Sequence, residues 1–440
     1  MASVTTPIAP SSAESALDRR AYRRVTLRLI PFLFLCYVVA YLDRVNVGFA
    51  KLQMLADLGM SDTAYGTGAG IFFIGYFLFE VPSNLILHRV GARVWIARIM
   101  VTWGVISILM MFVTGPLSFY LLRFLLGIAE AGFFPGIILY LTRWYPASRR
   151  AQIISLFLTG VAISGVIGGP LSGWILGSMS GVGGWAGWKW LFLLEGIPSV
   201  VMGIATYLYL PDSIDAATWI PQDERQRLLQ SLKHEAGGVE HASVFVTLRD
   251  PRVMLYAAIS FSFVMGLYGI SFWLPQLIRT MGVQDATRIG LLSGIPSAVA
   301  AIVMVVLGWS SDRFQERRWH LVGGALLGAT GLLIAGLFGT QLVIGLAAMS
   351  AAMAGALSNI ALFWTLPTAA LRGTSAAAGI AAINSIGNLA GFLSPYMIGV
   401  VKDATGEATV GLYVIAAFML IGAGLVLMAT RAKAGTRVVY

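Results

Sequence analysis

Four ionisable residues lie inside long apolar segments of this sequence. Asp43 and Arg44 follow the run LIPFLFLCYVVAYL, and Arg123 and Glu130 lie within LSFYLLRFLLGIAEAGFFPGIILYL. A charged side chain at membrane depth costs roughly 2.5–3.5 kcal/mol on insertion scales, so such residues are functional candidates. Guanidinium groups bind carboxylates through paired hydrogen bonds, and carboxyl groups take up and release protons. Two arginines and two acids together indicate a site for a charged solute and protons.

Helical spacing divides the residues of the first segment between two faces. Tyr37, Tyr41 and Arg44 follow the i, i+4, i+7 pattern and share one face. Asp43 is rotated by about 100° from Arg44, so it can face a neighbouring helix instead. The alternative is that Asp43 and Arg44 lie at the membrane interface, with side chains that reach water.

The second segment carries its two charges on one face. Arg123 and Glu130 are two turns apart, which separates them by about 10 Å along the helix axis. A structural alternative holds for both segments, because buried ion pairs can also fix the register of packed helices.

Other polar and aromatic residues in apolar segments are further candidates. Tyr76 can donate a hydrogen bond to an anion, and Asn384 and Asn388 lie one helical turn apart. Buried amides need hydrogen-bond partners, which a polar cavity provides. Gln276 and Trp364 can form cavity walls. Packing contacts and hydrogen bonds between helices explain the same residues without a ligand.

The composition indicates an integral membrane protein. Of 440 residues, 58% are hydrophobic and 11% are charged, whereas soluble proteins carry about 25% charged residues. The length accommodates about twelve spans of roughly 20 residues. The net charge of +10 fits basic loops on one side of a membrane, so we do not expect nucleic-acid binding.

Several function classes are disfavoured. A GxxxxGK[ST] motif is missing from the sequence, which argues against an ATP-driven pump. The four histidines lie near predicted loops or span ends, and no catalytic set accompanies them. We expect no enzyme activity, no cofactor and no metal. The opening MASVTTPIAPSSAES lacks the basic and apolar regions of a cleavable signal peptide.

Apolar runs recur twelve times. They fall near 25–45, 65–87, 94–114, 117–142, 151–179 and 188–210, and then near 252–279, 288–309, 320–339, 341–366, 373–400 and 409–431. This pattern predicts an all-α membrane protein with twelve transmembrane helices in two pseudo-symmetric six-helix bundles. The predicted divisions are a tail at 1–24, bundles at 25–210 and 251–431, a linker at 211–250 and a tail at 432–440.

Two further patterns concern orientation and packing. Basic residues gather before the first span, in the linker and after the last span. The positive-inside rule therefore predicts that both termini are cytoplasmic. In the fifth span Gly165, Gly169 and Gly173 recur every four residues, which predicts close contact with another helix.

The loop after the eighth span resembles a signature of the major facilitator superfamily, G-x-x-x-D-R-x-G-R. Gly308, Asp312 and Arg313 match it, whereas Gln315 and Glu316 stand at its later glycine and its final arginine. The equivalent loop of the first half keeps Arg89 but lacks the acid. The resemblance implies that Asp312, Arg313 and Arg89 belong to a gate.

Four longer segments resemble the anion:cation symporters, closest to the bacterial tartrate, phthalate and galactonate type. They are YLDRVNVGFAKLQM, FEVPSNLIL, RFLLGIAEAGFFPG and INSIGNLAGFLSPY. The resemblance implies that Arg44 and Arg123 bind the substrate carboxylate and that Asp43 and Glu130 carry protons. The expected further substrate contacts are Tyr41, Tyr76, Asn384, Asn388, Gln276 and Trp364.

The sequence therefore predicts a proton-coupled importer of a tartrate-like sugar acid or an aromatic carboxylate. Its expected partners are the small organic anion, protons and the lipid bilayer of a bacterial inner membrane, where it would act as a monomer by alternating access. An organic-anion exchanger is the first alternative. A nutrient sensor that does not transport is the second, although the linker of about forty residues is short for a signalling domain.

Overall fold

The computed structural model describes residues 16–233, 249–371 and 374–430. Within these ranges every regular element is a helix. A bilayer offers no hydrogen-bond partners to an open backbone, so helices are the expected solution for so apolar a chain. Eleven helical segments of the described ranges are long and apolar enough to cross a membrane.

The helices of the first half are α1 (Ala16–Val45), α2 (Val47–Leu58), α3 (Asp62–Val90), α4 (Ala92–Leu109), α5 (Pro116–Glu130), α6 (Phe133–Thr142), α7 (Ala147–Ser178) and α8 (Gly187–Tyr209). A short 3-10 helix, η1 (Met110–Phe112), follows α4, and η2 (Val182–Gly184) precedes α8. Those of the second half are α11 (Pro251–Thr280), α12 (Ala286–Phe314), α13 (Arg318–Phe338), α14 (Leu342–Phe363), α15 (Thr365–Ala370), α16 (Thr374–Asn388), α17 (Ala390–Thr405) and α18 (Thr409–Ala429).

Each of the twelve expected spans is occupied by one of these helices or by two consecutive ones, so the fold prediction is confirmed. The expected linker contains one helix, α9 (Gln222–Lys233). Residues 1–15, 234–248 and 431–440 of the expected tails and linker lie outside the described residues. The division into two six-helix domains stays a prediction.

Four spans are interrupted, and each interruption lies next to a candidate site residue. The α1–α2 break follows Arg44, and the α5–α6 break follows Glu130. The α14–α15 break falls at Trp364, and the α16–α17 break follows Asn388. At Asn46, Trp364 and Leu389 the backbone keeps helical φ and ψ angles, so these three interruptions are slight. At Ala131 and Gly132 the backbone leaves the helical region, so the α5–α6 interruption is a true break.

The α5–α6 break has a local cause in the sequence. Gly132 adopts φ 87°, a left-handed conformation that glycine reaches without a steric penalty. The Ser83 hydroxyl on α3 donates to the Ala131 carbonyl at 2.6 Å. The freed carbonyl is thus satisfied, and Glu130 is fixed at the end of α5.

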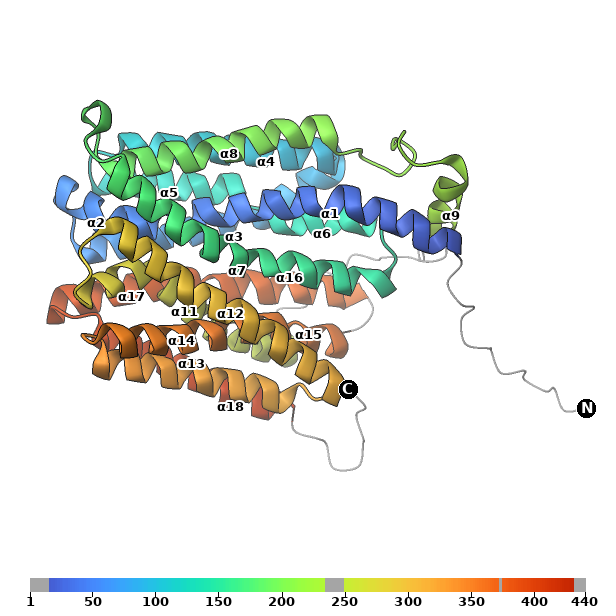
Figure 1. Ribbon diagram of the computed structural model, residues 1–440. Coiled ribbons are helices and arrows are strands. Elements are labelled where there is room, and N and C mark those ends of the chain that lie inside the picture. Colours follow the sequence, from blue (N-terminus) through green and yellow to red (C-terminus); the bar gives the residue numbers. More distant parts are fainter. Residues whose placement is uncertain (1–15, 234–248, 372–373, 431–440) are drawn as a thin grey trace, which may run out of the picture.

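The helices lie side by side along one common direction (Figure 1). The start of α1, α9 and the last turns of α18 lie at one end, which we call the terminal end. The connections from α2 to α3 and from α7 to α8 lie at the other, which we call the opposite end. Helix α7 contacts α12, and α3 contacts α17, so the two halves meet along these pairs.

The α7–α12 contact is close because glycines face each other. A Cβ atom on Gly169 would lie 2.7 Å from the Gly290 carbonyl oxygen, and one on Gly290 would lie 2.3 Å from the Gly169 oxygen. Neither distance is tolerated between packed backbones. The close contact predicted for Gly165, Gly169 and Gly173 is confirmed, because all three lie against α12 residues.

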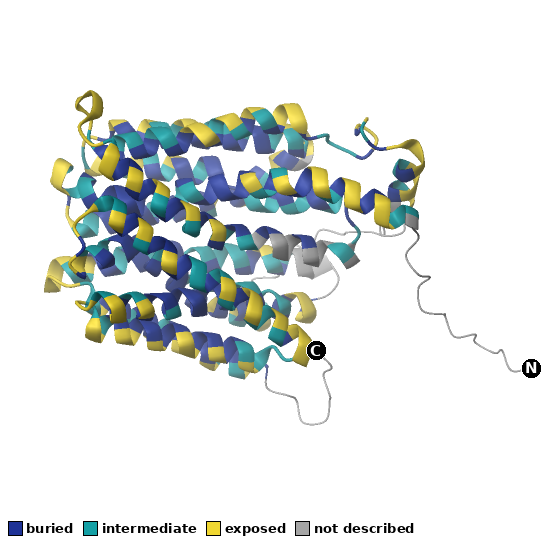
Figure 2. Cartoon of the chain, in the orientation of Figure 1, coloured by how far each residue is buried: buried dark blue, intermediate teal, exposed yellow. Residues whose placement is uncertain are grey.

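Figure 2 shows buried residues along the facing sides of the helices and exposed residues on their outer sides. Many exposed positions are large and apolar, including Leu208 at 75% and Val343 at 80% of full exposure. Side chains of this kind on an outer surface suit contact with lipid. The polar side chains described below are instead inside.

Candidate functional site

A cavity of about 110 Å³ lies between the first and second halves of the chain. Its walls come from α1, α3, α6 and α7 on one side and from α11, α12, α14 and α16 on the other. The candidate residues that line it are Tyr41, Arg44, Tyr76, Trp364, Asn384 and Asn388. The volume is below the roughly 300–1,000 Å³ typical of sites for drug-sized ligands, which favours a small substrate.

Arg44 is the charged residue among those that line this cavity. Its Nε lies 3.0 Å from Glu130 Oε1, and Nη2 pairs with the same oxygen. Its Nη1 donates to the Tyr268 hydroxyl at 3.0 Å. The Arg44 side chain is 13% exposed and that of Glu130 is 1% exposed. The arginine therefore stands between the cavity and the acid.

Aromatic rings surround the Arg44 guanidinium. Its Cζ lies 5.7 Å from the ring centroids of Tyr41 and Tyr76 and 5.5 Å from that of Phe72. Ring faces stabilise a cation through their quadrupole. Tyr37, Tyr41 and Arg44 all reach the cavity, as helical spacing predicts. Tyr41 Oη is buried and makes no hydrogen bond of normal geometry to any described residue.

Arg123 is not brought to the cavity. Its side chain is fully buried, and it donates from Nε to the Gly68 carbonyl at 3.2 Å and from Nη2 to the Ala69 carbonyl at 3.1 Å. Its Cζ lies 5.0 Å from the same Phe72 ring that Arg44 approaches. In the described part of the chain Nη1 finds no hydrogen-bond partner. These contacts join α5 to α3.

Asp43 also points away from the cavity, on the face that its rotation from Arg44 predicts. Its carboxylate accepts hydrogen bonds from Trp103 Nε1 at 2.7 Å and from the Ser107 hydroxyl at 2.8 Å, both on α4. The Ser199 hydroxyl on α8 donates to it as well. Asp43 is 1% exposed, so it lies in a polar pocket within the first half.

Asn384 connects the cavity to a third buried acid. Its Nδ2 donates to Glu80 Oε1 at 2.8 Å, and the neighbouring Ser385 hydroxyl donates to Glu80 Oε2 at 2.8 Å. Glu80 lies on α3 and its partners lie on α16, so the contact crosses between the halves. Glu80 therefore competes with any ligand for the Asn384 amide.

Gln276 and the gate candidates lie elsewhere. Gln276 follows Pro275 on α11, and it is not among the residues that line the cavity. At the terminal end Asp312 pairs with Arg317. The Cζ atom of Arg313 lies 6.0 Å from the centroid of the Trp309 ring, and Arg89 is exposed. No ion pair between described residues joins Arg89 to Asp312.

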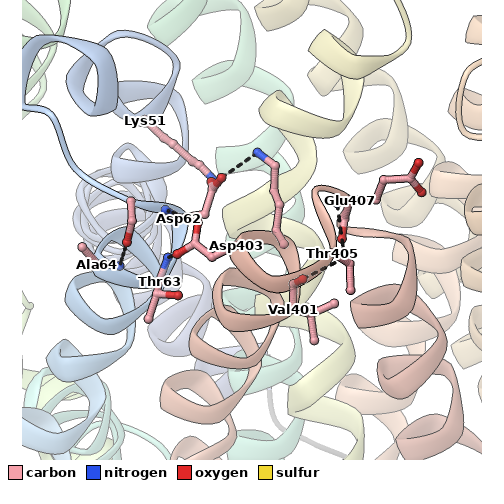
Figure 3. Close-up of polar contacts among 10 residues, drawn as sticks. Lys51, Asp62, Thr63, Ala64, Val401, Asp403, Thr405 and Glu407 are labelled. Carbon is pink, nitrogen blue, oxygen red and sulfur yellow. Dashed lines mark hydrogen bonds and ion pairs between the residues drawn. The ribbon is translucent and has the colours of Figure 1, made fainter.

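A second charged cluster joins the halves at the opposite end (Figure 3). Lys51 Nζ lies 2.6 Å from Asp62 Oδ1, and Lys402 Nζ lies 2.9 Å from Asp62 Oδ2. Asp403 on α17 accepts from the backbone N–H groups of Asp62 and Thr63 at 3.1 and 2.7 Å. These contacts hold the first turn of α3 against the end of α17.

Lys51 is the unusual member of this cluster. Its side chain is fully buried, and Nζ lies 3.1 Å from the centroid of the Trp273 ring on α11. The sequence shows Lys51 and Lys402 only as basic residues of sparse loops, so sequence reasoning missed the cluster. It also missed Tyr268, because a tyrosine in an apolar helix most often packs in a core. Neither role has a local signal, since the partners come from the other half.

The comparisons with known proteins agree on a transporter family. A sequence profile described as Major Facilitator Superfamily matches residues 33–395. A relative named "Putative tartrate transporter" from Agrobacterium vitis is 48% identical over 419 residues, which cover 95% of this chain and 93% of the relative. "Putative metabolite transport protein NicT" from Pseudomonas putida is 48% identical over 411 residues, which cover 92% and 93%.

The fold is also found among solved structures. A bacterial homologue of the human lysosomal transporter Spinster, in an inward-facing and unoccupied conformation, aligns with a TM-score of 0.74. The alignment covers 95% of this chain and 98% of that chain at 19% identity. At this identity the likeness concerns the fold alone.

Proposed function

Because this chain belongs to the major facilitator superfamily and is a multi-pass membrane transporter, we propose that it imports a small organic carboxylate together with protons. The observation that carries the proposal is the position of Arg44. A guanidinium lines the cavity between the halves, and an acid that can be protonated holds it from behind.

Competition for Arg44 would couple the anion to the proton. Ionised Glu130 occupies Nε and Nη2 of Arg44. A substrate carboxylate needs the same fork of donors to make two parallel hydrogen bonds. A proton on Glu130 removes its negative charge and frees the fork for the substrate. Release of that proton on the cytoplasmic side restores the ion pair and displaces the anion.

The other charged candidates take supporting parts in this proposal. The positive charge of Arg123 acts on Glu130, and we propose that it contributes to anion binding through its field. Asp43 lies next to Arg44 in the chain and is buried among hydrogen-bond donors. We propose that it binds a proton, as the resemblance implies.

The cavity walls favour a small hydroxylated or aromatic carboxylate. Tyr41, Tyr76, Asn384 and Asn388 offer hydroxyl and amide groups to the hydroxyls of a sugar acid. Their rings and that of Trp364 suit an aromatic acid equally well. The name of the Agrobacterium relative makes tartrate the first substrate to assay.

The two ends of the molecule suggest an orientation for alternating access. Arg89, Arg313 and Arg317 lie at the terminal end, so the positive-inside rule places that end in the cytoplasm. The opposite end, which the Lys51–Asp62 cluster closes, then faces the outside of a bacterial inner membrane. Import requires this cluster to part and re-form in each cycle.

Transport into liposomes tests the proposal. The purified chain is reconstituted, and uptake of labelled tartrate, galactonate and phthalate is measured with an acidic outside and an alkaline inside. We expect accumulation of at least one acid above its outside concentration, and its loss when a protonophore collapses the gradient.

Gradient-driven uptake is compared with the exchange of labelled for unlabelled substrate at equal pH on both sides. Exchange without gradient-driven accumulation would replace the proposal by an anion exchanger. Substrate binding without either flux would make the protein a sensor.

A further inference from the structure

Glu195 on α8 is a buried acid that the proposed transport mechanism does not use. Its side chain is 3% exposed, and Oε1 accepts a hydrogen bond from the Ser172 hydroxyl on α7 at 2.6 Å. Among the described residues Oε2 has no hydrogen-bond partner, and no cation pairs with the carboxyl group. An ionised carboxylate left unpaired in such a place is costly.

Glu195 shares its pocket with Asp43. Glu195 and Ser199 are one turn apart on α8 and therefore face the same way. The Ser199 hydroxyl donates to Asp43, so Asp43 lies beside the turn of α8 that carries Glu195. The charge of Asp43 therefore acts on Glu195. They form a pair of carboxyl groups inside the first half of the chain.

The two acids differ in the hydrogen bonds around them. Asp43 accepts three hydrogen bonds, from Trp103, Ser107 and Ser199, which suits an ionised carboxylate. Glu195 accepts one. The Asn46 amide faces Glu195, yet neither of its polar atoms makes a hydrogen bond of normal geometry within the described chain. A proton on Glu195 Oε2 would donate to Asn46 Oδ1 and satisfy both atoms.

Among the described residues, no ion pair joins a charged group of the other helices packed on α8 to Glu195. Helices α1, α2, α4 and α7 and the η1 turn pack on it. On α2, Lys51 binds Asp62, and Asp57 accepts from Trp188 Nε1 at 2.7 Å. On α4, Arg98 lies over the Trp95 ring at 3.8 Å. The arginines of α7 lie in its first turns, far along the helix from Ser172.

Ser172 gives the pocket a connection to a second cavity. This cavity, of about 50 Å³, lies between the halves and is lined by Ser172 together with Tyr41, Ser271 and Ser293. Tyr41 also lines the first cavity. Glu195 is therefore one hydrogen bond away from a cavity that adjoins the Arg44 site.

We propose that Glu195 is a proton-binding residue that shares one proton with Asp43, and that this proton is carried together with the substrate. The step is a reversible protonation: a hydronium ion that reaches the second cavity loses a proton and becomes water, and an O–H bond forms on the Glu195 carboxylate. The reverse step returns the proton to water. The coupling part of this inference rests on the proposed proton-driven import, whereas the protonation itself does not.

A metal cation fits the pocket less well than a proton. A bound cation needs several oxygen atoms with free lone pairs directed at one point. Both oxygens of Asp43 are already engaged by hydroxyl and indole donors. A single proton, in contrast, needs one free oxygen and one acceptor, which Glu195 and Asn46 supply.

Infrared spectroscopy of the full chain in liposomes tests the protonation. The carbonyl stretch of a protonated carboxylic acid is recorded at neutral pH for the parent protein and for Glu195→Gln. We expect the variant to lose one component of this absorption. Ser172→Ala keeps the acid but removes its hydrogen bond, so it should shift the component without removing it. An unchanged band in Glu195→Gln would overturn the proposal.

The number of protons per substrate, obtained from the reversal potential of transport, tests the coupling. We expect Glu195→Gln to lower this number by one. Because one proton is shared, Asp43→Asn combined with Glu195→Gln should lower it no further. A number of protons per substrate that stays at the parent value in Glu195→Gln would overturn the coupling role. So would a number that changes when choline replaces Na⁺ in the buffer.

Two controls separate the possible failures. If Glu195→Gln does not fold, Glu195→Asp takes its place. This variant keeps a carboxyl group, so it should retain a titrating carbonyl band. If the parent protein shows no gradient-driven accumulation, the proposed function fails while the infrared result still decides whether Glu195 is protonated.

Discussion

At the scale of single residues, Arg44 and Arg123 differ in what their guanidinium groups touch. Arg44 lines a cavity and pairs with Glu130, whereas Arg123 donates to two backbone carbonyls of α3. The sequence makes them equivalent, because both are single arginines in apolar runs. Their different surroundings depend on α3, which lies far from either residue in the chain.

Replacement of Arg44 tests the substrate site. Arg44→Lys keeps a positive charge but loses the planar fork, so one of two charge-assisted hydrogen bonds to the carboxylate is lost. We expect substrate affinity to fall by about ten- to a hundredfold, the equivalent of a hydrogen bond to a charged group. Isothermal titration of tartrate onto the purified protein measures this change.

Two matched variants interpret that result. Arg313 lies at the terminal end against Trp309, so Arg313→Lys should bind substrate as the parent does. Arg123→Lys leaves the Gly68 and Ala69 carbonyls without their fork, so it should lower thermal stability as well as affinity. Parent-like affinity in Arg44→Lys would remove Arg44 from the site.

Replacement of Glu130 tests the coupling. Glu130→Gln imitates the protonated acid but cannot release a proton, so Arg44 stays free for the substrate throughout the cycle. We expect gradient-driven accumulation to be lost while exchange of labelled substrate at equal pH continues. Glu407→Gln, whose contacts are with Thr405 and Thr409, serves as a neutralised control. Accumulation by Glu130→Gln at the parent level would move the coupled proton to Asp43 or Glu195.

At the scale of helices, the sequence predicts the spans well but not their interruptions. A span is specified by a local run of apolar residues, so all twelve were found from the chain alone. The break after Glu130 has a local cause in Gly132, but the Ser83 hydroxyl that satisfies the freed Ala131 carbonyl comes from another helix. For the same reason Glu195 escaped notice, since its importance comes from Ser172 on α7 and Asp43 on α1.

The departure from the family signature at Glu316 has a structural explanation. Glu316 Oε1 accepts from the Trp319 N–H at 2.7 Å, and Oε2 accepts from His320 Nδ1 at 2.7 Å. The carboxylate therefore caps the first turn of α13, where the helix dipole favours negative charge. Although partial burial opposes ionisation, these hydrogen bonds outweigh it and hold the pKa of Glu316 below its usual range.

This capping contact predicts a dependence of stability on acidity. Because the pKa of Glu316 is lowered by folding, the carboxylate stabilises the folded state at neutral pH, and this contribution fades as the pH falls below about 4. We expect Glu316→Gln to unfold at a lower temperature than the parent at neutral pH, with the difference shrinking in acid. The effect should stay below about 1 kcal/mol because the carboxyl group is only partly buried and solvent screens its charge. Thermal unfolding in detergent across pH measures it, and a difference that is constant with pH would contradict the capping role.

The cluster at the opposite end predicts a shift between conformations. Asp403 accepts hydrogen bonds from the first N–H groups of α3, so Asp403→Asn weakens the contact between α3 and α17. We expect the open fraction to rise roughly two- to fivefold, as for the loss of one charge at a helix N-terminus.

A cysteine in place of Ser271, which lines the second cavity, reports this opening in a Cys36→Ala background. A membrane-impermeant maleimide added outside should label it faster in Asp403→Asn. The hydrogen-bond partners of Glu407 are Thr405 and Thr409, both in the second half of the chain, so Glu407→Gln should leave the rate unchanged. Equal labelling of parent and Asp403→Asn would contradict a gating role for the cluster.

At the scale of the whole molecule, the contacts between the halves determine which end is closed. At the opposite end the halves meet through glycines of α7 and α12 and through the Lys51–Asp62 cluster. Near the Arg44 site they meet through Glu80 and α16. Transport by alternating access requires that both sets of contacts be reversible, so their strengths must be balanced.

A bulky residue at the α7–α12 contact should upset this balance in one direction. A Cβ atom on Gly290 would lie 2.3 Å from the Gly169 carbonyl oxygen and 2.7 Å from Gly173 Cα. Backbone atoms cannot yield to such a contact, so Gly290→Val should hold the halves apart at the opposite end. Gly424→Val on α18 is the matched control, because a Cβ atom there meets nothing within 4 Å. We expect Gly290→Val to bind substrate from outside and to label readily at a cysteine in place of Ser271. Accumulation should fall by at least tenfold, which corresponds to a free-energy cost of closure of about 1.4 kcal/mol or more. Parent-like accumulation in Gly290→Val would mean that α7 and α12 do not need to close in the transport cycle.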